Sequence, residues 1–338
     1  MSNTLGVGVI GCGLISVNHF KALRQLKGTE LVAVCDIDPT ALNKAAETQG
    51  VKGYQDYHEL LADEQVQVVH ICTPHYLHAS IAIDALNAGK HVLCEKPMAI
   101  KSADAERMVE AAHRNGRQLG ICFQNRYNES SKKIRSLLDS GEMGRVLGGC
   151  AVVTWDRGEK YYGQAEWRGK WATEGGAVLI NQAIHTFDLL RDFAGEIVDL
   201  KCSMSAKRLA DVIEVEDTCD MLLTNQDGCR FLFYASNCGV GNSPVQISLK
   251  CENGDIRLLG NRVTVQFKDG RIIDEDYSSG FTYGKDYWGS GHGFLIEDFY
   301  RCIHTGEPFP INGEEALKTT YLIEKAYTEH CEQRRCCL

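Results

Sequence analysis

A glycine-rich turn between an apolar segment and an amphipathic segment constrains this chain more than any other feature. The turn, Gly11–Ser16 (GCGLIS), follows the apolar residues Leu5–Ile10 and precedes a segment whose apolar residues recur at helical spacing. Glycine lets the backbone turn tightly, and the first turn of a helix offers free N–H groups and a partial positive charge. A strand, a glycine turn and a helix in this order predict a pyrophosphate-binding site. The alternative is a glycine turn in an unrelated α/β protein.

Short apolar segments alternate with amphipathic ones over residues 1–122. The apolar segments are rich in Val, Ile and Cys, as strands covered on both faces are. We expect strands at Leu5–Ile10, Glu30–Cys35, Val66–Cys72, His91–Cys94 and Gln118–Phe123, with a further short one near Lys52–Tyr54. We expect helices over residues 15–26, over Leu77–Ala88, and from the N-cap Ser102 to Gly116. Repeated β-α-β units require a parallel sheet, so this half is predicted to be a doubly wound α/β Rossmann domain.

Residues 123–338 show a different pattern, with strand-like segments that are not separated by long helices. The expected strands are Arg145–Trp155, Val198–Ala206, Thr218–Thr224, Cys229–Ala235, Val245–Cys251, Asp255–Leu259 and Val263–Phe267. Helices are expected at Ser130–Asp139, Ala177–Phe193, Gly293–His304 and Gly313–Cys331. The pattern predicts an α+β C-terminal domain with a mostly antiparallel open sheet. The last helix is a candidate to pack back on the Rossmann domain.

Bulk properties exclude several classes of protein. A chain of 338 residues is long enough for two domains, and its net charge of −9 argues against nucleic-acid partners and anionic membranes. No apolar run reaches the ~18 residues that span a bilayer, and the polar start is no signal peptide, so we expect a cytoplasmic protein. The fifteen cysteines are scattered through apolar runs, which is typical of free thiols in a reducing compartment.

No metal is expected. The tail cysteines Cys331, Cys336 and Cys337 offer an alternative metal site, but a frayed terminus explains their spacing as well. His75 and His78 have the spacing of metal ligands, yet no further ligand is placed in the sequence to complete a site.

An acidic residue, Asp36, ends the second predicted strand 25 residues after Gly11. A carboxylate at this point accepts hydrogen bonds from both hydroxyls of an adenosine ribose and repels a 2′-phosphate. The neighbours Ile37 and Asp38 supply no cation, so NAD is favoured over NADP. Ser16 replaces the third glycine of the fingerprint, which a small residue allows. The turn residues expected at the cofactor are Gly11, Gly13, Leu14 and Ile15.

The tripeptide Glu95-Lys96-Pro97 follows the predicted strand His91–Cys94, at the carboxyl edge where open α/β sheets bind ligands. A lysine there reaches both a nicotinamide ribose and a substrate hydroxyl, and its charge stabilises a developing alkoxide. Glu95 is placed to orient the ammonium group. The alternative for so short a motif is a surface turn.

A polar face is predicted on the helix Ala177–Phe193, because Asn181, His185 and Asp188 follow one another at one-turn spacing. Imidazole titrates near neutral pH and suits general acid–base catalysis on an alcohol. A core histidine held by Asp188 is the alternative, and helical spacing alone does not decide between them.

Taken together, these motifs resemble the Gfo/Idh/MocA family, the relatives of glucose–fructose oxidoreductase and inositol dehydrogenase. The motifs that occur in family order are Gly11–Ser16, Asp36, Thr73-Pro74 with His78, Glu95-Lys96-Pro97, and Gly175-Gly176 leading to His185 and Asp188. The resemblance covers essentially the whole chain, including residues 296–327. It implies that Lys96 and His185 are the catalytic pair. It also implies that Thr73, Pro74, His78, Glu95 and Lys96 contact the cofactor.

The sequence departs from the family pattern at one position. Sugar dehydrogenases of the family often carry Asp four residues before the histidine, and this chain has Asn181. Asn hydrogen-bonds a substrate hydroxyl but cannot share a proton. The base role therefore falls on His185, with Lys96 assisting.

Three further groups are candidates for the substrate site. Asn125 and Arg126 follow the last Rossmann strand, and Arg126 has an interdomain salt bridge as its alternative role. Tyr161, Trp167, Arg168 and Trp171 form an aromatic, arginine-bearing loop that resembles the branch of the family acting on nucleotide-sugars and glycosides; packing of the tryptophans is the alternative. Tyr283, Tyr287 and His292 are candidates to close the pocket. Asn181 and Asp188 complete the expected substrate-binding residues.

The function expected from these residues is reversible NAD-dependent oxidation of a secondary hydroxyl to a ketone in a sugar, glycoside, sugar nucleotide or inositol. One alternative, also found in the family, is an NAD-dependent glycosidase that oxidises its substrate only transiently. The other is a non-catalytic NAD-binding sensor, which the Lys96 and His185 pair argues against. No nucleic acid or membrane is expected as a partner. The family resemblance implies a homodimer or homotetramer that associates through the C-terminal sheet.

Overall fold

The computed structural model of the chain describes residues 4–278 and 291–336. It divides into two compact units, one formed by residues 1–124 and 292–320 and the other by residues 125–291 and 321–338. The chain passes from the first unit to the second two residues after the expected domain boundary. The segment 292–320 returns to the first unit, which therefore contains most of α9 (Gly291–Thr305) and the start of α10 (Gly313–Cys336).

A six-stranded parallel sheet forms the centre of the first unit, in the order β3-β2-β1-β4-β5-β6. The strands are β1 (Leu5–Ile10), β2 (Thr29–Cys35), β3 (Lys52–Tyr54), β4 (Val68–Ile71), β5 (His91–Cys94) and β6 (Leu119–Ile121). The residues of β1, β4, β5 and β6 are almost all buried, as expected for strands covered on both faces, whereas β2 is buried only in its second half and β3 only at Tyr54. The strand order places a topological switch point between β1 and β4, where ligands bind in doubly wound folds.

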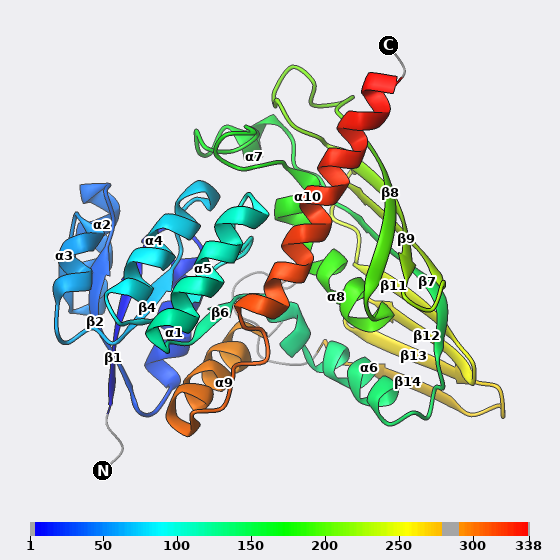
Figure 1. Cartoon of the computed structure of the whole chain (residues 1–338), viewed down its shortest axis with the longest axis horizontal. Helices are drawn as coiled ribbons and strands as arrows, with labels where there is room; N and C mark the ends of the chain where they lie inside the picture. The colour runs from blue at the N-terminus through cyan, green and yellow to red at the C-terminus, as the bar shows by residue number, and fades with distance from the viewer. Residues whose placement is uncertain (1–3, 279–290, 337–338) are drawn as a thin grey trace. The chain divides into compact units, whose positions relative to one another are not determined.

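Helices cover both faces of this sheet and connect its strands. They are α1 (Ser16–Gln25), α2 (Pro39–Gln49), α3 (Tyr57–Ala62), α4 (His75–Asn87) and α5 (Ser102–Asn115). The helices α4 and α5 lie side by side (Figure 1). The expectation that Ser102 caps α5 is wrong, because Ser102 is already helical and Lys101 holds the N-cap position. None of the helices described is both long and apolar enough to cross a membrane.

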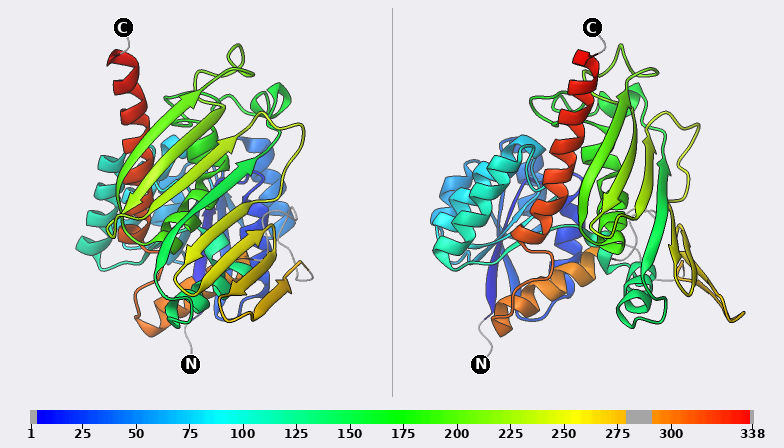
Figure 2. Two further views of the ribbon diagram at one scale, coloured as in Figure 1. Left: turned by 90° about the vertical axis from the view of Figure 1, so that its right-hand side faces the viewer. Right: turned by 45° about the vertical axis from the view of Figure 1, so that its right-hand side comes forward.

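An eight-stranded sheet forms the second unit, in the order β14-β13-β12-β11-β7-β10-β9-β8. Its strands are β7 (Val146–Thr154), β8 (Ile197–Ser205), β9 (Thr218–Asn225), β10 (Arg230–Ser236), β11 (Gln246–Cys251), β12 (Gly254–Leu259), β13 (Arg262–Phe267) and β14 (Ile272–Asp276). All neighbouring pairs are antiparallel except β7 with β10. Figure 2 shows the strands side by side in one open sheet. The predicted fold class, a Rossmann domain plus a mostly antiparallel second sheet, is confirmed.

One face of the second sheet carries its helices, and the opposite face is open. Side chains along β10 alternate between buried and exposed, so Phe231 and Phe233 point inward while Leu232 and Tyr234 point outward. Phe233 meets Phe187 of α8 (Ile184–Ala194) at a ring-centroid distance of 5.3 Å. The same inner side holds α6 (Glu129–Asp139), and the short helix α7 (Glu159–Tyr162) lies in the loop after β7.

The expected helix Ala177–Phe193 is not continuous. A π-helical turn, η2 (Val178–Gln182), precedes α8, and Ala183 separates the two. Gly176 comes just before this turn with φ +145°, and a Cβ on it would lie 1.9 Å from the Tyr327 hydroxyl. The close approach of α10 thus sets the backbone here. The regular spacing from which we predicted one polar face does not run from Asn181 to His185.

Candidate active site

The glycine turn at the end of β1 is shaped for close backbone approach. Gly11 has φ +92°, and a Cβ on it would lie 2.6 Å from the carbonyl oxygen of Cys72 and 2.9 Å from the amide nitrogen of Thr73. Gly13 faces open space, with nothing within 4 Å of its Cβ position. The buried Ser16 hydroxyl donates to the Gly13 carbonyl over 2.7 Å and closes the turn. Leu14, beside it, is 78% exposed. The turn leaves space in front of the N-terminus of α1.

Asp36 lies directly beside this turn. Its Oδ2 accepts a hydrogen bond from Cys12 N at 2.7 Å, and its Oδ1 accepts one from Asp38 N at 2.9 Å. Both carboxylate oxygens keep further lone pairs, and the side chain is half-buried. The carboxylate is therefore fixed in the position where a ribose diol binds in dinucleotide-binding folds.

The loop after β4 contributes Thr73 and Pro74. The buried Thr73 Oγ1 has no hydrogen-bond partner among the described residues, as expected of a hydroxyl that serves a ligand. His78, in α4, has its Nε2 2.8 Å from the Thr73 carbonyl oxygen and its Nδ1 2.7 Å from the Pro97 carbonyl oxygen. Burial lowers the pKa of His78, so the ring is neutral at pH 7 and donates to one carbonyl at a time. His78 therefore connects the Thr73 loop to the Lys96–Pro97 loop.

A buried cluster of histidines surrounds Glu95. Glu95 Oε1 lies 3.1 Å from His19 Nε2 and 3.3 Å from His292 Nε2, and Glu95 Oε2 accepts from Lys96 N at 3.2 Å. Burial alone would raise the pKa of the Glu95 carboxyl, but the hydrogen bonds from His19 and His292 outweigh it and hold the pKa well below its ordinary value. Burial lowers the pKa of His292, so this neutral ring donates a hydrogen bond rather than forming an ion pair.

The cluster continues from His19 through His70 to Tyr300 of α9. His19 Nδ1 lies 2.9 Å from His70 Nδ1, and Tyr300 Oη lies 2.9 Å from His70 Nε2. Burial lowers the pKa of His70 well below its ordinary value and raises that of Tyr300 well above it. Both groups are therefore neutral, and Tyr300 donates to His70 Nε2. His70 must then donate from Nδ1 to His19, and His19 from Nε2 to Glu95. A single direction of donation, from Tyr300 towards Glu95, therefore satisfies every hydrogen bond of this series.

His19, Glu95 and Cys122 also meet the spacing of metal ligands, because their donor atoms lie within 4.8 Å of one another. Both ring nitrogens of His19 already have hydrogen-bond partners, and burial raises the pKa of the Cys122 thiol well above its ordinary value. A metal would have to displace this network and deprotonate the thiol. Hydrogen bonding is the interpretation that the contacts support.

Lys96 follows Glu95 at the carboxyl end of β5 and is half-buried. Its backbone N–H is fixed by Glu95, and the next residue, Pro97, receives the contact from His78. The sequence placed His292 in the substrate pocket, whereas it is fully buried beside Glu95. His292 therefore supports the Lys96 loop. Tyr283 and Tyr287 lie outside the described residues.

In the second unit, buried carboxylates hold the π-helical turn. Asn181 Nδ2 donates to Glu174 Oε1 at 2.5 Å, and Glu216 Oε1 accepts from Leu179 N at 3.0 Å and from Tyr327 Oη at 2.9 Å. Burial raises the pKa of Glu216 to about 7, although the backbone N–H groups of Leu179 and Ala177 oppose this rise. The amide of Asn181 is thus oriented by Glu174.

Arg126 and Asp188 form a bidentate pair. Arg126 Nε lies 2.6 Å from Asp188 Oδ2, Arg126 Nη2 lies 2.7 Å from Asp188 Oδ1, and Arg126 Nη1 lies 3.1 Å from Asp192 Oδ1. Asp188 is 1% exposed. These two ion pairs of Arg126 lie inside the second unit. Neighbouring Asn125 has a buried Oδ1 with no partner among the described residues.

His185 is the second residue of α8 and is half-buried, unlike the fully covered residues that follow it. Its position near the start of the helix follows from the end of the π-helical turn at Gln182. Both Asp188 oxygens accept hydrogen bonds from Arg126. His185 remains a partly accessible imidazole.

The loop before Gly175 stacks its cations on aromatic rings. Arg168 Cζ lies 4.2 Å from the Tyr161 ring centroid and 4.8 Å from that of Trp167. The Tyr161 hydroxyl accepts a hydrogen bond from Gln182 Nε2 at 2.9 Å and another from Arg168 Nη1. Trp171 instead packs its ring edge-on against Tyr327, at 5.3 Å between centroids. The structure thus brings Tyr161, Trp167 and Arg168 together and separates Trp171 from them.

The residues of the first unit fit a dinucleotide. At Gly11 the glycine turn leaves no room for a side chain beside Cys72 and Thr73. Asp36 accepts hydrogen bonds from two backbone N–H groups. The Thr73 hydroxyl has no hydrogen-bond partner among the described residues. Together with the second open sheet, these features define a two-unit protein with a dinucleotide-binding fold.

Two models of one protein family match the chain. The model described as the oxidoreductase family with NAD-binding Rossmann fold matches residues 5–123, and that of the GFO/IDH/MocA C-terminal domain matches residues 131–257. The chain belongs to the Gfo/Idh/MocA family, and its first unit is an NAD-binding Rossmann fold.

Several relatives carry specific names. Inositol 2-dehydrogenase of Salmonella paratyphi B is 40% identical over 148 residues, which are 43% of this chain and 44% of that protein, so the match spans less than half of this curated relative. D-apiose dehydrogenase of Paraburkholderia graminis is 26% identical over 96% of this chain and 88% of its own. The WlbA dehydrogenase of Bordetella pertussis, crystallised with NADH and UDP-GlcNAcA, has a TM-score of 0.86 and 28% identity over 98% of each chain.

Proposed function

We propose that this protein is an NAD-dependent dehydrogenase that reversibly oxidises a secondary hydroxyl of a sugar or sugar derivative to a ketone. The observation that carries the proposal is the buried Glu95 network. It fixes Lys96 at the carboxyl end of the sheet whose glycine turn and Asp36 fit a dinucleotide. Relatives named for inositol and D-apiose, and one crystallised with UDP-GlcNAcA, support a polyhydroxylated substrate.

Lys96 and His185 are the proposed catalytic residues. A bound NAD would supply the hydride acceptor for the carbon that carries the hydroxyl. His185 takes the hydroxyl proton, and the Lys96 ammonium stabilises the negative charge that develops on oxygen. Asn181 does not compete as a base, since a carboxamide does not take up a proton at physiological pH and its amide N–H is held by Glu174. In the reverse direction His185 returns the proton to the ketone oxygen.

Asp36 supports NAD over NADP. Its charge occupies the position beside the glycine turn at which a 2′-phosphate would lie, and the exposed neighbours Ile37 and Asp38 offer no cation. The remaining proposed cofactor contacts are Gly11, Gly13, Leu14, Ile15, Thr73 and Pro74. His78 and Glu95 act through the loops that they hold.

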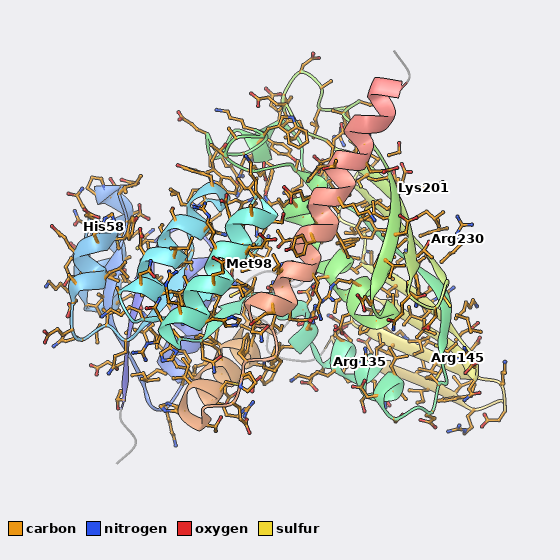
Figure 3. All side chains as sticks on the ribbon, viewed as in Figure 1. His58, Met98, Arg135, Arg145, Lys201 and Arg230 are labelled. Carbon is orange, nitrogen blue, oxygen red and sulfur yellow. The ribbon has the colours of Figure 1, made fainter. Side chains whose placement is uncertain are left out.

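We further propose that two copies associate through the open face of the second sheet. Leu232 is 60% exposed there, and a shallow groove beside it is lined by Cys150, Val152, Lys201, Asp220 and Tyr234. Figure 3 shows Lys201 and Arg230 on this sheet. The exposed side chains of Leu232 and Tyr234 on this open face favour its burial against a second copy. Light scattering should give a dimer or tetramer that Leu232→Glu dissociates; a monomeric wild type would contradict this assembly.

The test of the activity is a panel of sugars, inositols, glycosides and UDP-sugars with NAD, followed at the NADH absorbance. General acid–base groups contribute about 100- to 10,000-fold, so Lys96→Ala and His185→Ala should each reduce kcat by that order. The exposed residues Lys44 and His304 provide matched control variants, Lys44→Ala and His304→Ala, which should keep full activity. Activity that survives both catalytic substitutions contradicts the proposal. Product release without net NADH would instead favour the transient-oxidation glycosidase.

A further inference from the structure

Within residues 4–278 and 291–330, whose side chains the structure describes, the Arg168 guanidinium has no carboxylate partner. Among the described residues its only hydrogen-bond acceptor is the neutral Tyr161 hydroxyl, and its buried Nε has none. By contrast, Arg126 and Arg191, whose side chains are 12% and 7% exposed, contact the carboxylate of Asp188 at 2.6 and 3.6 Å. A guanidinium stays charged at any physiological pH, and buried charges are normally paired. Arg168 therefore has unused donor capacity in a partly desolvated place.

Tyr161 has an unused donor as well. Its hydroxyl oxygen accepts from Arg168 Nη1 and from Gln182 Nε2, which occupies both lone pairs. The hydroxyl proton itself has no acceptor among the residues that the structure describes. Two neighbouring groups, one charged and one neutral, thus both require an external acceptor.

A second positive charge lies at the same tyrosine. Arg157 is 8% exposed, and its Cζ lies 5.4 Å from the Tyr161 ring centroid. The buried carboxylate of this loop, Glu174, accepts from Asn181 Nδ2 and from Gly169 N. The rings of Tyr161 and Trp167 hold the Arg168 guanidinium flat, which suits forked binding to two oxygens of one anion.

This cluster is attached to the segment that carries His185. Gln182, which donates to Tyr161, ends the π-helical turn three residues before His185, and its Oε1 accepts from Asn237 Nδ2 at 3.1 Å. Asn237 also donates to the hydroxyl of Tyr162. A ligand group bound at Arg168 would therefore be held on the same rigid support as the proposed catalytic base.

We propose that Arg168, with Arg157 and Tyr161, binds an anionic group of the substrate, so that the molecule oxidised is an acidic sugar derivative. The group is a carboxylate or a phosphate, both of which present two oxygens to a guanidinium fork. This inference rests on the proposed dehydrogenase function and specifies its substrate class.

The test compares matched neutral and anionic compounds as substrates with NAD. The pairs are glucose with glucuronate, glucose with glucose 6-phosphate, and N-acetylglucosamine with UDP-N-acetylglucosamine. The anionic member should have the higher kcat/KM, and the pair that shows this separates a carboxylate from a phosphate ligand. Arg168→Gln should raise KM for the anionic member about 10- to 100-fold with little change in kcat, because the lost bonds are made in the ground state too. Arg168→Lys should recover part of the loss, and Arg114→Gln, at an exposed position of α5, is the matched control.

The outcomes separate this inference from the proposed function. Oxidation of neutral compounds with equal or better efficiency, unaffected by Arg168→Gln, overturns the anion site and leaves the dehydrogenase. An equal loss for neutral and anionic members shows a structural role for Arg168 and also overturns it.

If the protein binds NADH but turns over none of these compounds, the dehydrogenase proposal fails. The anion site is then tested by direct binding of the anionic compounds. Glucuronate, glucose 6-phosphate and UDP-N-acetylglucosamine are then titrated against tryptophan fluorescence, which reports on Trp167 beside Arg168. A response that salt and Arg168→Gln both abolish supports the site. No response to any of the three overturns it.

Discussion

Tyr300→Phe is the sharpest test of the buried network beneath Lys96. The substitution removes one hydroxyl and keeps the ring, which is 3% exposed and packs against Phe299 at 5.9 Å between centroids. Its only expected effect is on His70 Nε2, the acceptor that lies 2.9 Å from the hydroxyl.

The magnitude follows from the surroundings of His70. His70 is fully buried, and its Nδ1 proton is committed to His19, so the ring cannot turn to the other tautomer without breaking that bond as well. A buried acceptor left without its donor costs about 1–3 kcal/mol, and the apolar remainder of Tyr300 loses nothing. We therefore expect the free energy of unfolding to fall by about 1–3 kcal/mol.

Equilibrium urea unfolding measures this loss, with an unchanged m value as the sign that only stability has changed. The matched control is Tyr76→Phe, because Tyr76 is 47% exposed and should stay within about 0.5 kcal/mol of the wild type. A Tyr300→Phe variant as stable as the control would refute the reasoning, since the donation from Tyr300 through His70 and His19 to Glu95 would then contribute nothing.

Two further predictions concern other carboxylates. Glu216 has an ordinary pKa of 4.5 that burial raises to about 7. The folded protein therefore favours the protonated carboxyl. The contribution of Glu216 to the free energy of unfolding is complete below pH 4.5 and is lost as the pH rises to about 7, a change of about 3 kcal/mol. Urea unfolding between pH 4.5 and 8 measures this change. As the pH rises, the free energy of unfolding of the wild type should fall relative to that of Glu216→Gln by that amount. Equal pH dependence of the two free energies would contradict the prediction. Asp36→Ser removes the carboxylate that Cys12 N holds beside the glycine turn. The ratio of kcat/KM with NADP to kcat/KM with NAD should therefore rise at least about tenfold. An unchanged ratio would contradict the role assigned to Asp36.

Local patterns predicted most elements of the first unit, because its strands are apolar on both faces and helices such as α5 end at a glycine, here Gly116. The strands Leu5–Ile10 and His91–Cys94 have the expected bounds. The helix α2 was missed although Asp38 caps Thr40 N and Gly50 ends it with φ +69°. The strand β14 was missed because Ile272–Asp276 is an exposed edge strand with little apolar signal.

Contacts between distant segments could not be predicted from local patterns. His19 has the spacing of an apolar helix face, and nothing near it in the sequence indicates that it meets His70, Glu95 and then His292. The π-helical turn that interrupts the expected helix follows Gly176, where a Cβ would lie 1.9 Å from the hydroxyl of the distant Tyr327. For the same reason, the pairing of Asp188 with Arg126 could be found only in the structure.

The most direct test of the proposed dehydrogenase is the stoichiometry of its reaction with the best compound of the panel. Mass spectrometry of the product and the absorbance of NADH should show a ketone with two hydrogens fewer than the substrate and one NADH for each molecule formed. A product at the oxidation level of the substrate, or a cleaved glycoside without NADH, would contradict the proposed function.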